Sequence, residues 1–287
     1  MHSIAILGAG ELAATLARRV AEQELARRVV LVDPDESRAR GKALDIAQSG
    51  PIEGFDVQVE AAASLAAAGA FEALVVADPP ELADSRAAPA RARALGESLA
   101  PEVGKRVLVV AADSASTVVE AAVRKGMSRE HVVGSAPVAY AAALTRRLAT
   151  EMQVEPRAVS ALVLGTPPAE MVVPRESARV GGVPVDRLSA VALRRAVAGL
   201  AGRTLGPAAL AAAAARVLRA LDGPRPSILG VLVSLDGEYG HRRVAVAVPA
   251  RLVAGRVDSV VEVPLDPVDR VAFDRAAERR LQEAYWA

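Results

Sequence analysis

Short apolar runs alternate with amphipathic stretches along the first half of the chain. The apolar runs, most of them rich in valine, leucine or isoleucine, lie at residues 3–7, 29–33, 55–59, 71–77, 106–111 and 131–135. Helical spacing of apolar residues marks the stretches between them, at about residues 11–28, 36–49, 87–99 and 116–125, with a stop predicted at Ser49-Gly50-Pro51. Strands that alternate with helices are typical of a parallel sheet covered by helices on both faces. The first half is therefore predicted to be a doubly wound α/β fold.

The pattern changes after residue 134. Helices are predicted at about residues 138–152, 187–201, 208–221 and 267–284, and strands at residues 161–165, near 172 and at 257–263. Residues 228–235 and 243–248 flank a turn at Asp236-Gly237-Glu238-Tyr239-Gly240, which indicates an antiparallel hairpin. This order of elements predicts an α+β second half. We expect two domains, residues 1–134 and residues 135–287.

The first 33 residues combine a strand, a glycine turn, a helix and a second strand that ends in an acid. Gly8 permits a tight turn, and Gly10 leaves room for a pyrophosphate beside the backbone. The helix then begins at Glu11 and Leu12, where we expect free backbone N–H groups to bind the pyrophosphate. Asp33 follows about 20 residues later, where a carboxylate accepts hydrogen bonds from ribose hydroxyls. These five residues are the predicted dinucleotide-binding set, with a glycine turn inside another kind of α/β protein as the alternative.

Composition narrows the classes of partner and of functional site that the chain can have. Apolar residues make up 52% of the chain and aromatic residues only 2%, which predicts a core of alanine, valine and leucine. A net charge of +1 argues against a nucleic acid or a membrane surface as partner. Without cysteines there is no disulfide, thiolate nucleophile or cysteine metal site, and we predict no metal site of another kind. No apolar run is long enough to span a membrane and the first strand begins at once, so we expect a cytoplasmic protein.

Several motifs, in order along nearly the whole chain, resemble the lactate/malate dehydrogenase family, and within it the bacterial malate dehydrogenases of lactate-dehydrogenase type. Besides the glycine turn, they are Gly41-Lys42-Ala43-Leu44-Asp45-Ile46, Val132-Val133-Gly134, Val163-Leu164-Gly165, Gly181-Gly182-Val183-Pro184, Gly237-Glu238-Tyr239-Gly240 and Val261-Glu262-Val263-Pro264-Leu265. The resemblance implies a Rossmann-type domain followed by the family's α+β C-terminal domain. It also implies NAD as cofactor, hydride transfer between NAD and malate, and a homo-oligomer, dimer or tetramer, with residues 41–46 at a subunit interface.

The chain departs from the family wherever the chemistry needs a particular side chain. The family's catalytic histidine transfers a proton, an aspartate orients it, arginines hold the substrate, and an asparagine binds the hydroxyl oxygen. By the resemblance, Pro167 stands at the histidine position, Tyr140 at the aspartate and Ala143 at the carboxylate-binding arginine. Ala112 replaces the asparagine, and Arg86 is the nearby candidate for the loop arginine. We therefore predict no catalytic residues of the family type.

Two other sets of residues bear on activity and cofactor. The chain's histidines, His2, His131 and His241, are each expected to have a surface or structural role rather than to replace the missing catalytic histidine.

Asp78 and Pro79 replace a stretch that, by the resemblance, lies beside the cofactor. An anion there opposes the pyrophosphate, and proline removes a backbone N–H. NAD binding is therefore left open by the sequence.

Two hypotheses follow. The first is a catalytically inactive malate dehydrogenase-like protein, a pseudoenzyme that keeps the fold and its oligomer interfaces, alone or in a mixed assembly with an active paralogue. The alternative is an active NAD-dependent oxidoreductase of the malate or 2-hydroxy acid type, with Tyr140 as an unrecognised proton donor. That alternative requires an open, polar pocket with a charged anchor, for which the candidates are Arg146, Arg147 and Arg175.

Overall fold

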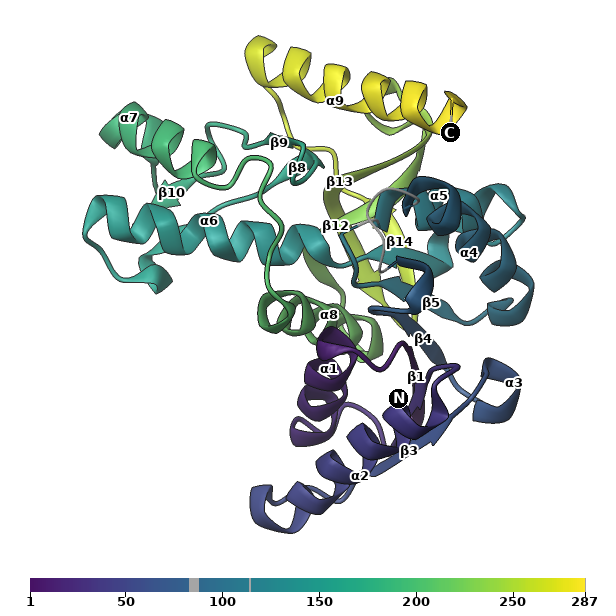
Figure 1. The fold of residues 1–287 in the computed structure, drawn as a ribbon. Helices are drawn as coiled ribbons and strands as arrows, with labels where there is room; N and C mark the ends of the chain where they lie inside the picture. The colour runs from purple at the N-terminus through teal and green to yellow at the C-terminus, as the bar shows by residue number, and fades with distance from the viewer. Residues whose placement is uncertain (83–87, 114, 287) are drawn as a thin grey trace.

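The computed structural model describes residues 1–82, 88–113 and 115–286. Its centre is a parallel sheet in the order β3-β2-β1-β4-β5-β6, of which β1, β3, β4 and β5 are labelled in Figure 1. The bounds of these strands are β1 (Ser3–Leu7), β2 (Arg28–Val32), β3 (Gln58–Ala62), β4 (Ala73–Val76), β5 (Val107–Val110) and β6 (Val132–Gly134). The chain leaves β1 in one direction and returns to its other side at β4. This topology confirms the predicted doubly wound sheet and places a switch point at the carboxyl ends of β1 and β4.

Helices cover both faces of this sheet because its side chains alternate between two apolar cores. Ile4 and Ile6 of β1 face the core that contains α1 and α2, whereas Ala5 between them faces the core of α3, α4 and α5. The helices run as α1 (Glu11–Glu22), α2 (Glu36–Glu53), α3 (Leu65–Ala68), α4 (Ala88–Val103) and α5 (Ala115–Arg124). Burial on both faces explains why the strands read as continuous apolar runs.

The second half extends the same sheet with antiparallel strands. The predicted hairpin is confirmed as β12 and β13, and β12 joins the parallel part by pairing with β6 at Leu232 and Gly134. In the described residues the result is one eleven-stranded sheet and a separate three-stranded one. The strands are β7 (Val159–Ser160), β8 (Leu164–Thr166), β9 (Glu170–Val172), β10 (Arg179–Val180), β11 (Val183–Pro184), β12 (Ser227–Asp236), β13 (Arg242–Val253) and β14 (Arg256–Val260). Because the sheet is continuous, a domain boundary at residue 134 stays a prediction.

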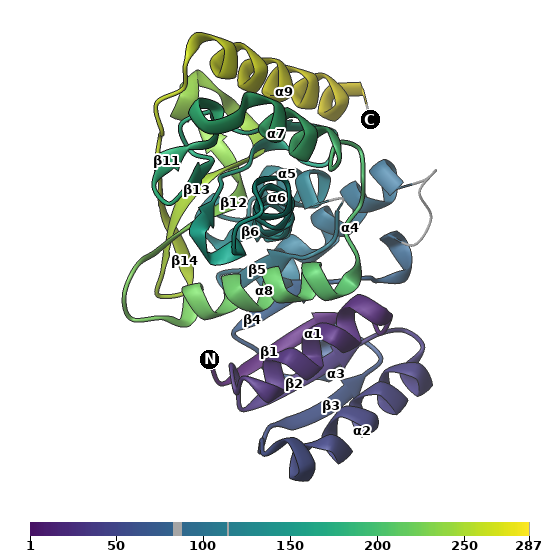
Figure 2. The same cartoon turned by 90° about the vertical axis from the view of Figure 1, so that its left-hand side faces the viewer.

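Four long helices complete the second half. In Figure 2, α8 crosses in front of the sheet beside α1, while α9 lies at the opposite end over the hairpin. These helices are α6 (Ala136–Met152), α7 (Val185–Ala198), α8 (Pro207–Asp222) and α9 (Pro267–Trp286). Short 3₁₀ turns lie at Pro80–Leu82, Arg129–His131, Pro156–Ala158 and Glu238–Gly240. No helix in the described part of the chain is long and apolar enough to cross a membrane.

The ends of two predicted helices are wrong. The helix predicted to reach residue 28 ends at Glu22, because Glu24 adopts a left-handed conformation (φ +48°) and the chain turns back. The stop predicted at Pro51 does not end α2, which continues to Glu53. Pro51 lies in the last turn of α2, which ends where Gly54 (φ +82°) donates its N–H to the carbonyl of Gly50 at 2.8 Å.

Two strand predictions also shift. The strand expected at residues 55–59 begins and ends three residues later, at Gln58–Ala62, because Phe55 and Val57 instead pack as buried side chains in the connection to α2. Of the strand expected at residues 161–165, only Leu164 and Gly165 form a strand, as the start of β8 (Leu164–Thr166), and residues 161–163 belong to no strand.

Candidate functional site

The predicted glycine turn lies at the switch point, between β1 and α1. Gly8 has a φ of +110°, which only glycine adopts without strain, and its N–H donates to the carbonyl of Val32 at 2.8 Å. The first helical residue, Glu11, is exposed, as its tolerance in a phosphate-facing turn requires. The turn therefore has the conformation that the sequence predicts.

The anion held by this turn is the chain's own Asp78, which follows β4. One carboxylate oxygen, Oδ2, accepts the N–H of Leu12 at 2.8 Å. The other, Oδ1, accepts the N–H groups of Gly10 at 3.2 Å and Ala13 at 3.3 Å. Free N–H groups at the start of a helix, and the positive end of its dipole, stabilise an anion at this position.

Asp78 also fills the space beside Gly8 and Gly10, which have no side chains. A Cβ atom on Gly10 would lie 2.3 Å from Oδ2 of Asp78, and one on Gly8 would lie 2.7 Å from the Asp78 backbone. Both distances are shorter than any allowed contact. In this structure the glycines therefore accommodate Asp78, at the place where the sequence predicted a pyrophosphate.

The predicted ribose-binding acid, Asp33, is likewise engaged within the chain. Its side chain is fully buried, and Oδ2 accepts a hydrogen bond from Arg38 Nη2 at 2.8 Å. Its Oδ1 accepts the N–H of Asp35 at 2.9 Å. The hydrogen bond and charge of Asp33 raise the pKa of Arg38 further above its usual range. The structure thus brings the five predicted cofactor residues together. The N–H groups of the glycine turn and the Asp33 carboxylate, which would bind the cofactor, both have partners within the chain.

Tyr140 of α6 is fully buried, and its hydroxyl has partners within the protein. It donates to the backbone carbonyl of Arg203 at 3.0 Å, and Asp113 Oδ1 lies 3.4 Å from it. Burial, followed by the charge of Asp113, raises the pKa of Tyr140. Burial also raises the pKa of Asp113, against the opposing effect of the tyrosine hydrogen bond.

Pro167 lines a cavity of about 150 Å³ beside Asp113. Pockets that bind small molecules usually measure about 300–1,000 Å³. The cavity's cations are already paired: Arg279 Nη1 lies 2.9 Å from Glu170, and Arg280 binds Glu120. The full lining is Asp113, Ser116, Thr117, Thr166, Pro167, Pro168, Ala169, Glu170, Arg279, Arg280 and Glu283.

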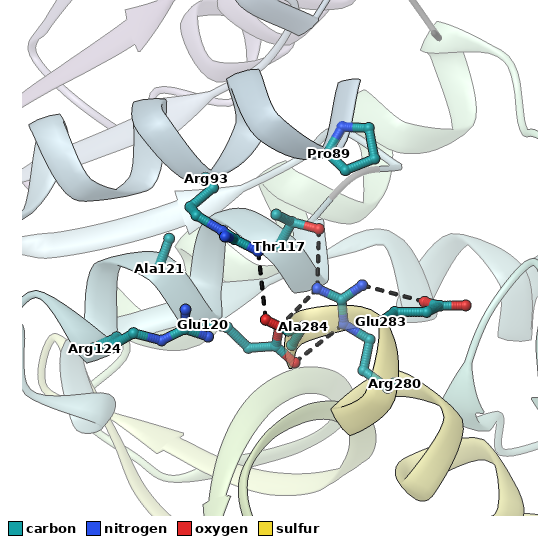
Figure 3. A pocket seen from close by; sticks show the side chains of 9 residues that line it. All are labelled: Pro89, Arg93, Thr117, Glu120, Ala121, Arg124, Arg280, Glu283 and Ala284. Atoms are coloured by element: carbon teal, nitrogen blue, oxygen red, sulfur yellow. Dashed lines mark hydrogen bonds and ion pairs between the residues drawn. The ribbon is translucent and has the colours of Figure 1, made fainter. Parts of the chain in front are cut away.

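A second cavity, of about 280 Å³, lies between α4, α5 and the end of α9 (Figure 3). Arg280 reaches from α9 into its wall, where its Nη2 lies 2.6 Å from Glu120 Oε2 and donates to Thr117 Oγ1 at 2.9 Å. Glu120 Oε1 also accepts the N–H of Ala245 at 3.0 Å. Both charged side chains are largely buried, so this ion pair fixes α9 against α5 and β13.

The remaining predicted candidates lie elsewhere. None of the histidines, and none of Arg146, Arg147 and Arg175, is among the described residues that line the cavity beside Pro167. His241 Nε2 lies 2.8 Å from Oδ1 of Asp274, which is a residue of α9. Arg86 lies outside the described residues. Within the described ranges no cluster of histidine, aspartate and glutamate has the arrangement of a metal site.

Comparison with known proteins agrees with this architecture. A family model described as lactate/malate dehydrogenase, NAD binding domain, matches residues 2–86. Malate dehydrogenase from Thermomicrobium roseum is 33% identical over 96% of this chain and 95% of its own length. Malate dehydrogenase from Chloroherpeton thalassium is 30% identical over 96% of this chain and 94% of its own. The chain belongs to the lactate/malate dehydrogenase family.

Solved structures of the family share the fold over the whole chain. The malate dehydrogenase of Salinibacter ruber superimposes with a TM-score of 0.86 at 27% identity, covering 98% of this chain and 96% of that one. That of Aeropyrum pernix gives a TM-score of 0.89 at 22% identity, covering 99% and 98%. The fold class predicted from the sequence is confirmed.

The family implies NAD, and the residues at the glycine turn do not fit it as they are arranged here. A pyrophosphate on α1 needs the N–H groups of Gly10, Leu12 and Ala13, all of which Asp78 occupies. Its negative charge would also lie against the Asp78 carboxylate. Sequence reasoning identified Asp78 as unfavourable to NAD but did not find its contacts, which join residues more than 60 positions apart. The Arg38 contact to Asp33 was also missed, although their i, i+5 spacing across the start of α2 was a signal.

Proposed function

We propose that this malate dehydrogenase-like protein is a pseudoenzyme without malate dehydrogenase activity, which acts through binding or assembly. The observation that carries the proposal is Pro167, which by the resemblance stands at the histidine position and which lines the cavity beside Asp113. Proline has no side-chain proton to transfer. A positioned acid–base group contributes about 10²–10⁴-fold to a rate, and an electrostatic stabiliser about 10²–10³-fold. Losing both kinds of group reduces the expected rate to near background.

The state of the neighbouring positions supports the same proposal. Ala112 and Ala143 offer only methyl groups where the resemblance places an asparagine and an arginine. The cavity's arginines, Arg279 and Arg280, are held by Glu170 and Glu120. A substrate carboxylate would therefore have to compete with an existing ion pair for either cation.

The alternative, an active oxidoreductase with Tyr140 as proton donor, is less well supported. Its hydroxyl is buried and directed at the carbonyl of Arg203 rather than at solvent. Burial raises its pKa, so that transfer of its proton becomes less favourable. These contacts are those of an aromatic side chain that fills and seals the vacated site.

Assembly is the role that the surface supports. On α2, Leu44 is 56% exposed and Ile52 is 87% exposed, and their spacing of eight places them on the same side of the helix. Leu44 belongs to the motif that resembles a family subunit interface. We propose a cytoplasmic homo-oligomer, dimer or tetramer, and a mixed assembly with an active paralogue is compatible with the same surface.

The test is oxaloacetate-dependent oxidation of NADH by the purified protein, beside Tyr140→Phe. The proposal predicts that both proteins give the rate of the protein-free blank. A rate above the blank in the unaltered protein would contradict the proposal. If Tyr140→Phe then removed that rate while staying folded, Tyr140 would be the proton donor of the alternative.

A further inference from the structure

We infer that Asp78 is an internal substitute for a pyrophosphate, and that its carboxylate excludes dinucleotides from the glycine turn of this protein. The inference deepens the proposed function and rests on it for the identity of the displaced ligand. Its basis is the position of a single side chain, described above, and the chemistry of the groups around that side chain.

Asp78 already uses the hydrogen-bond donors of the glycine turn. The two oxygens of Asp78 accept N–H groups from Gly10, Leu12 and Ala13 at 2.8–3.3 Å. The N–H groups at the start of a helix are those that bind phosphate oxygens in dinucleotide-binding proteins. A carboxylate is an anion with two acceptor oxygens, so it can accept these N–H groups as a phosphate does. The same donors cannot bind a pyrophosphate while Asp78 holds them.

Asp78 also blocks the glycine turn by its volume and its negative charge. A Cβ on Gly10 would be only 2.3 Å from Asp78 Oδ2, so the side chain occupies the volume that glycine keeps free. Any ligand that approached this backbone would meet the same atoms. A phosphate would also bring negative charge against a carboxylate that already has its favourable partners.

The residues that follow Asp78 in the sequence hold it in position. Pro79 follows it, and a residue before proline is restricted to extended backbone conformations. Pro80 then begins a 3₁₀ turn directly after it. The side chain therefore returns to the turn at little cost in conformational entropy, as an intramolecular ligand present at high effective concentration.

The ribose end of the site is engaged in the same way. Asp33 is fully buried and accepts hydrogen bonds from Arg38 and from the N–H of Asp35. A ribose would have to displace the Arg38 guanidinium or share the carboxylate with it. Both anchors of a dinucleotide are therefore satisfied by the chain itself.

The experiment compares the unaltered protein with Asp78→Ala, which vacates the turn, and Asp78→Asn, which keeps the shape without the charge. Asp56→Ala is the matched control, since Asp56 is an exposed aspartate of the same half. NADH binding is followed by fluorescence titration, and inorganic pyrophosphate binding by the shift in unfolding temperature. Circular dichroism checks that each variant is folded.

A ligand's apparent affinity is reduced by the fraction of protein in the competent state, so Asp78→Ala should bind NADH at least about tenfold more tightly than the unaltered protein. Pyrophosphate should raise the unfolding temperature of Asp78→Ala and leave that of the unaltered protein and Asp56→Ala unchanged. Asp78→Asn should lie between them.

Two results would overturn the inference. One is NADH binding by the unaltered protein as tight as that by Asp78→Ala. The other is folded Asp78→Ala and Asp78→Asn proteins that bind neither probe better than the unaltered protein. The proposed function is read separately from oxaloacetate turnover: NADH binding by the unaltered protein as tight as that by Asp78→Ala, without turnover, would remove the inference alone, whereas turnover would remove both.

Discussion

At the scale of single residues, this chain shows a carboxylate placed where an anionic ligand was expected. The sequence predicts the glycine turn, the tight conformation of that turn and Asp33 as the acid at the end of the second strand. It does so because the motif lies within one continuous stretch of the chain. The contact of Asp78 with Leu12 depends on β1 and β4 lying side by side, which brings residues 66 positions apart to 2.8 Å. Local patterns do not contain that information, so the sequence identified Asp78 as unfavourable to NAD without predicting its partners.

Asp113 provides a pH test of the sealed site. Burial raises its pKa above the ordinary value. Between the pKa of Asp113 in the unfolded chain and its higher pKa in the folded protein, the folded state binds more protons, so the free energy of unfolding should fall as pH rises through that window. Asp113→Asn removes the ionisation and should be more stable than the unaltered protein at pH 7, with the difference shrinking towards acidic pH.

Urea unfolding across a pH series measures this difference directly. Asp56→Asn, at an exposed position, is the control and should show no such trend. A constant difference between Asp113→Asn and the unaltered protein at every pH, or lower stability of the variant at pH 7, would contradict the assignment.

At the scale of elements, the sequence predicts the type and order of helices and strands well, because each carries its own apolar periodicity. Its errors lie at the ends of elements and at short elements that it did not predict, namely α3, β7, β10 and β11. The end of α1 depends on the left-handed turn at Glu24, and α2 continues past Pro51 to the left-handed Gly54. How α9 docks was not predictable either, since it depends on an ion pair between residues 160 positions apart.

That ion pair predicts a large effect of one substitution on α9. Arg280→Met leaves the buried Glu120 carboxylate without its counter-charge, which should lower the free energy of unfolding by about 3–5 kcal/mol. The matched control on the same helix is Arg275→Met, whose exposed guanidinium is 3.9 Å from Glu170 and should cost at most about 1 kcal/mol.

Chemical denaturation of the two variants gives both values, and adding Glu120→Gln to Arg280→Met should recover part of the loss. Equal effects of Arg280→Met and Arg275→Met would show that the Glu120 contact does not hold α9 in place.

At the scale of the whole molecule, the protein keeps the family architecture, and under the proposed function this architecture serves binding or assembly rather than catalysis. One eleven-stranded sheet in the described residues still joins the two halves, and the apolar residues on α2 remain exposed in the single chain. Selection for packing and for contacts between subunits would preserve these features without selection for chemistry. We therefore expect the unaltered 29.6 kDa chain to associate.

Light scattering coupled to size exclusion should give the mass of a dimer or tetramer. Leu44→Glu combined with Ile52→Glu places charge on the exposed side of α2 and should shift the protein towards monomer without unfolding it. A monomeric mass for the unaltered protein at tens of micromolar would contradict the assembly proposal.

The most direct test of the central claim is one NADH fluorescence trace, recorded as the unaltered protein and then oxaloacetate are added. With Asp78 in the glycine turn and Pro167 beside the cavity, we predict that the signal stays that of free NADH through both additions. An increase on adding protein would show that the cofactor displaces Asp78. A decay on adding oxaloacetate would show catalysis and contradict the account as a whole.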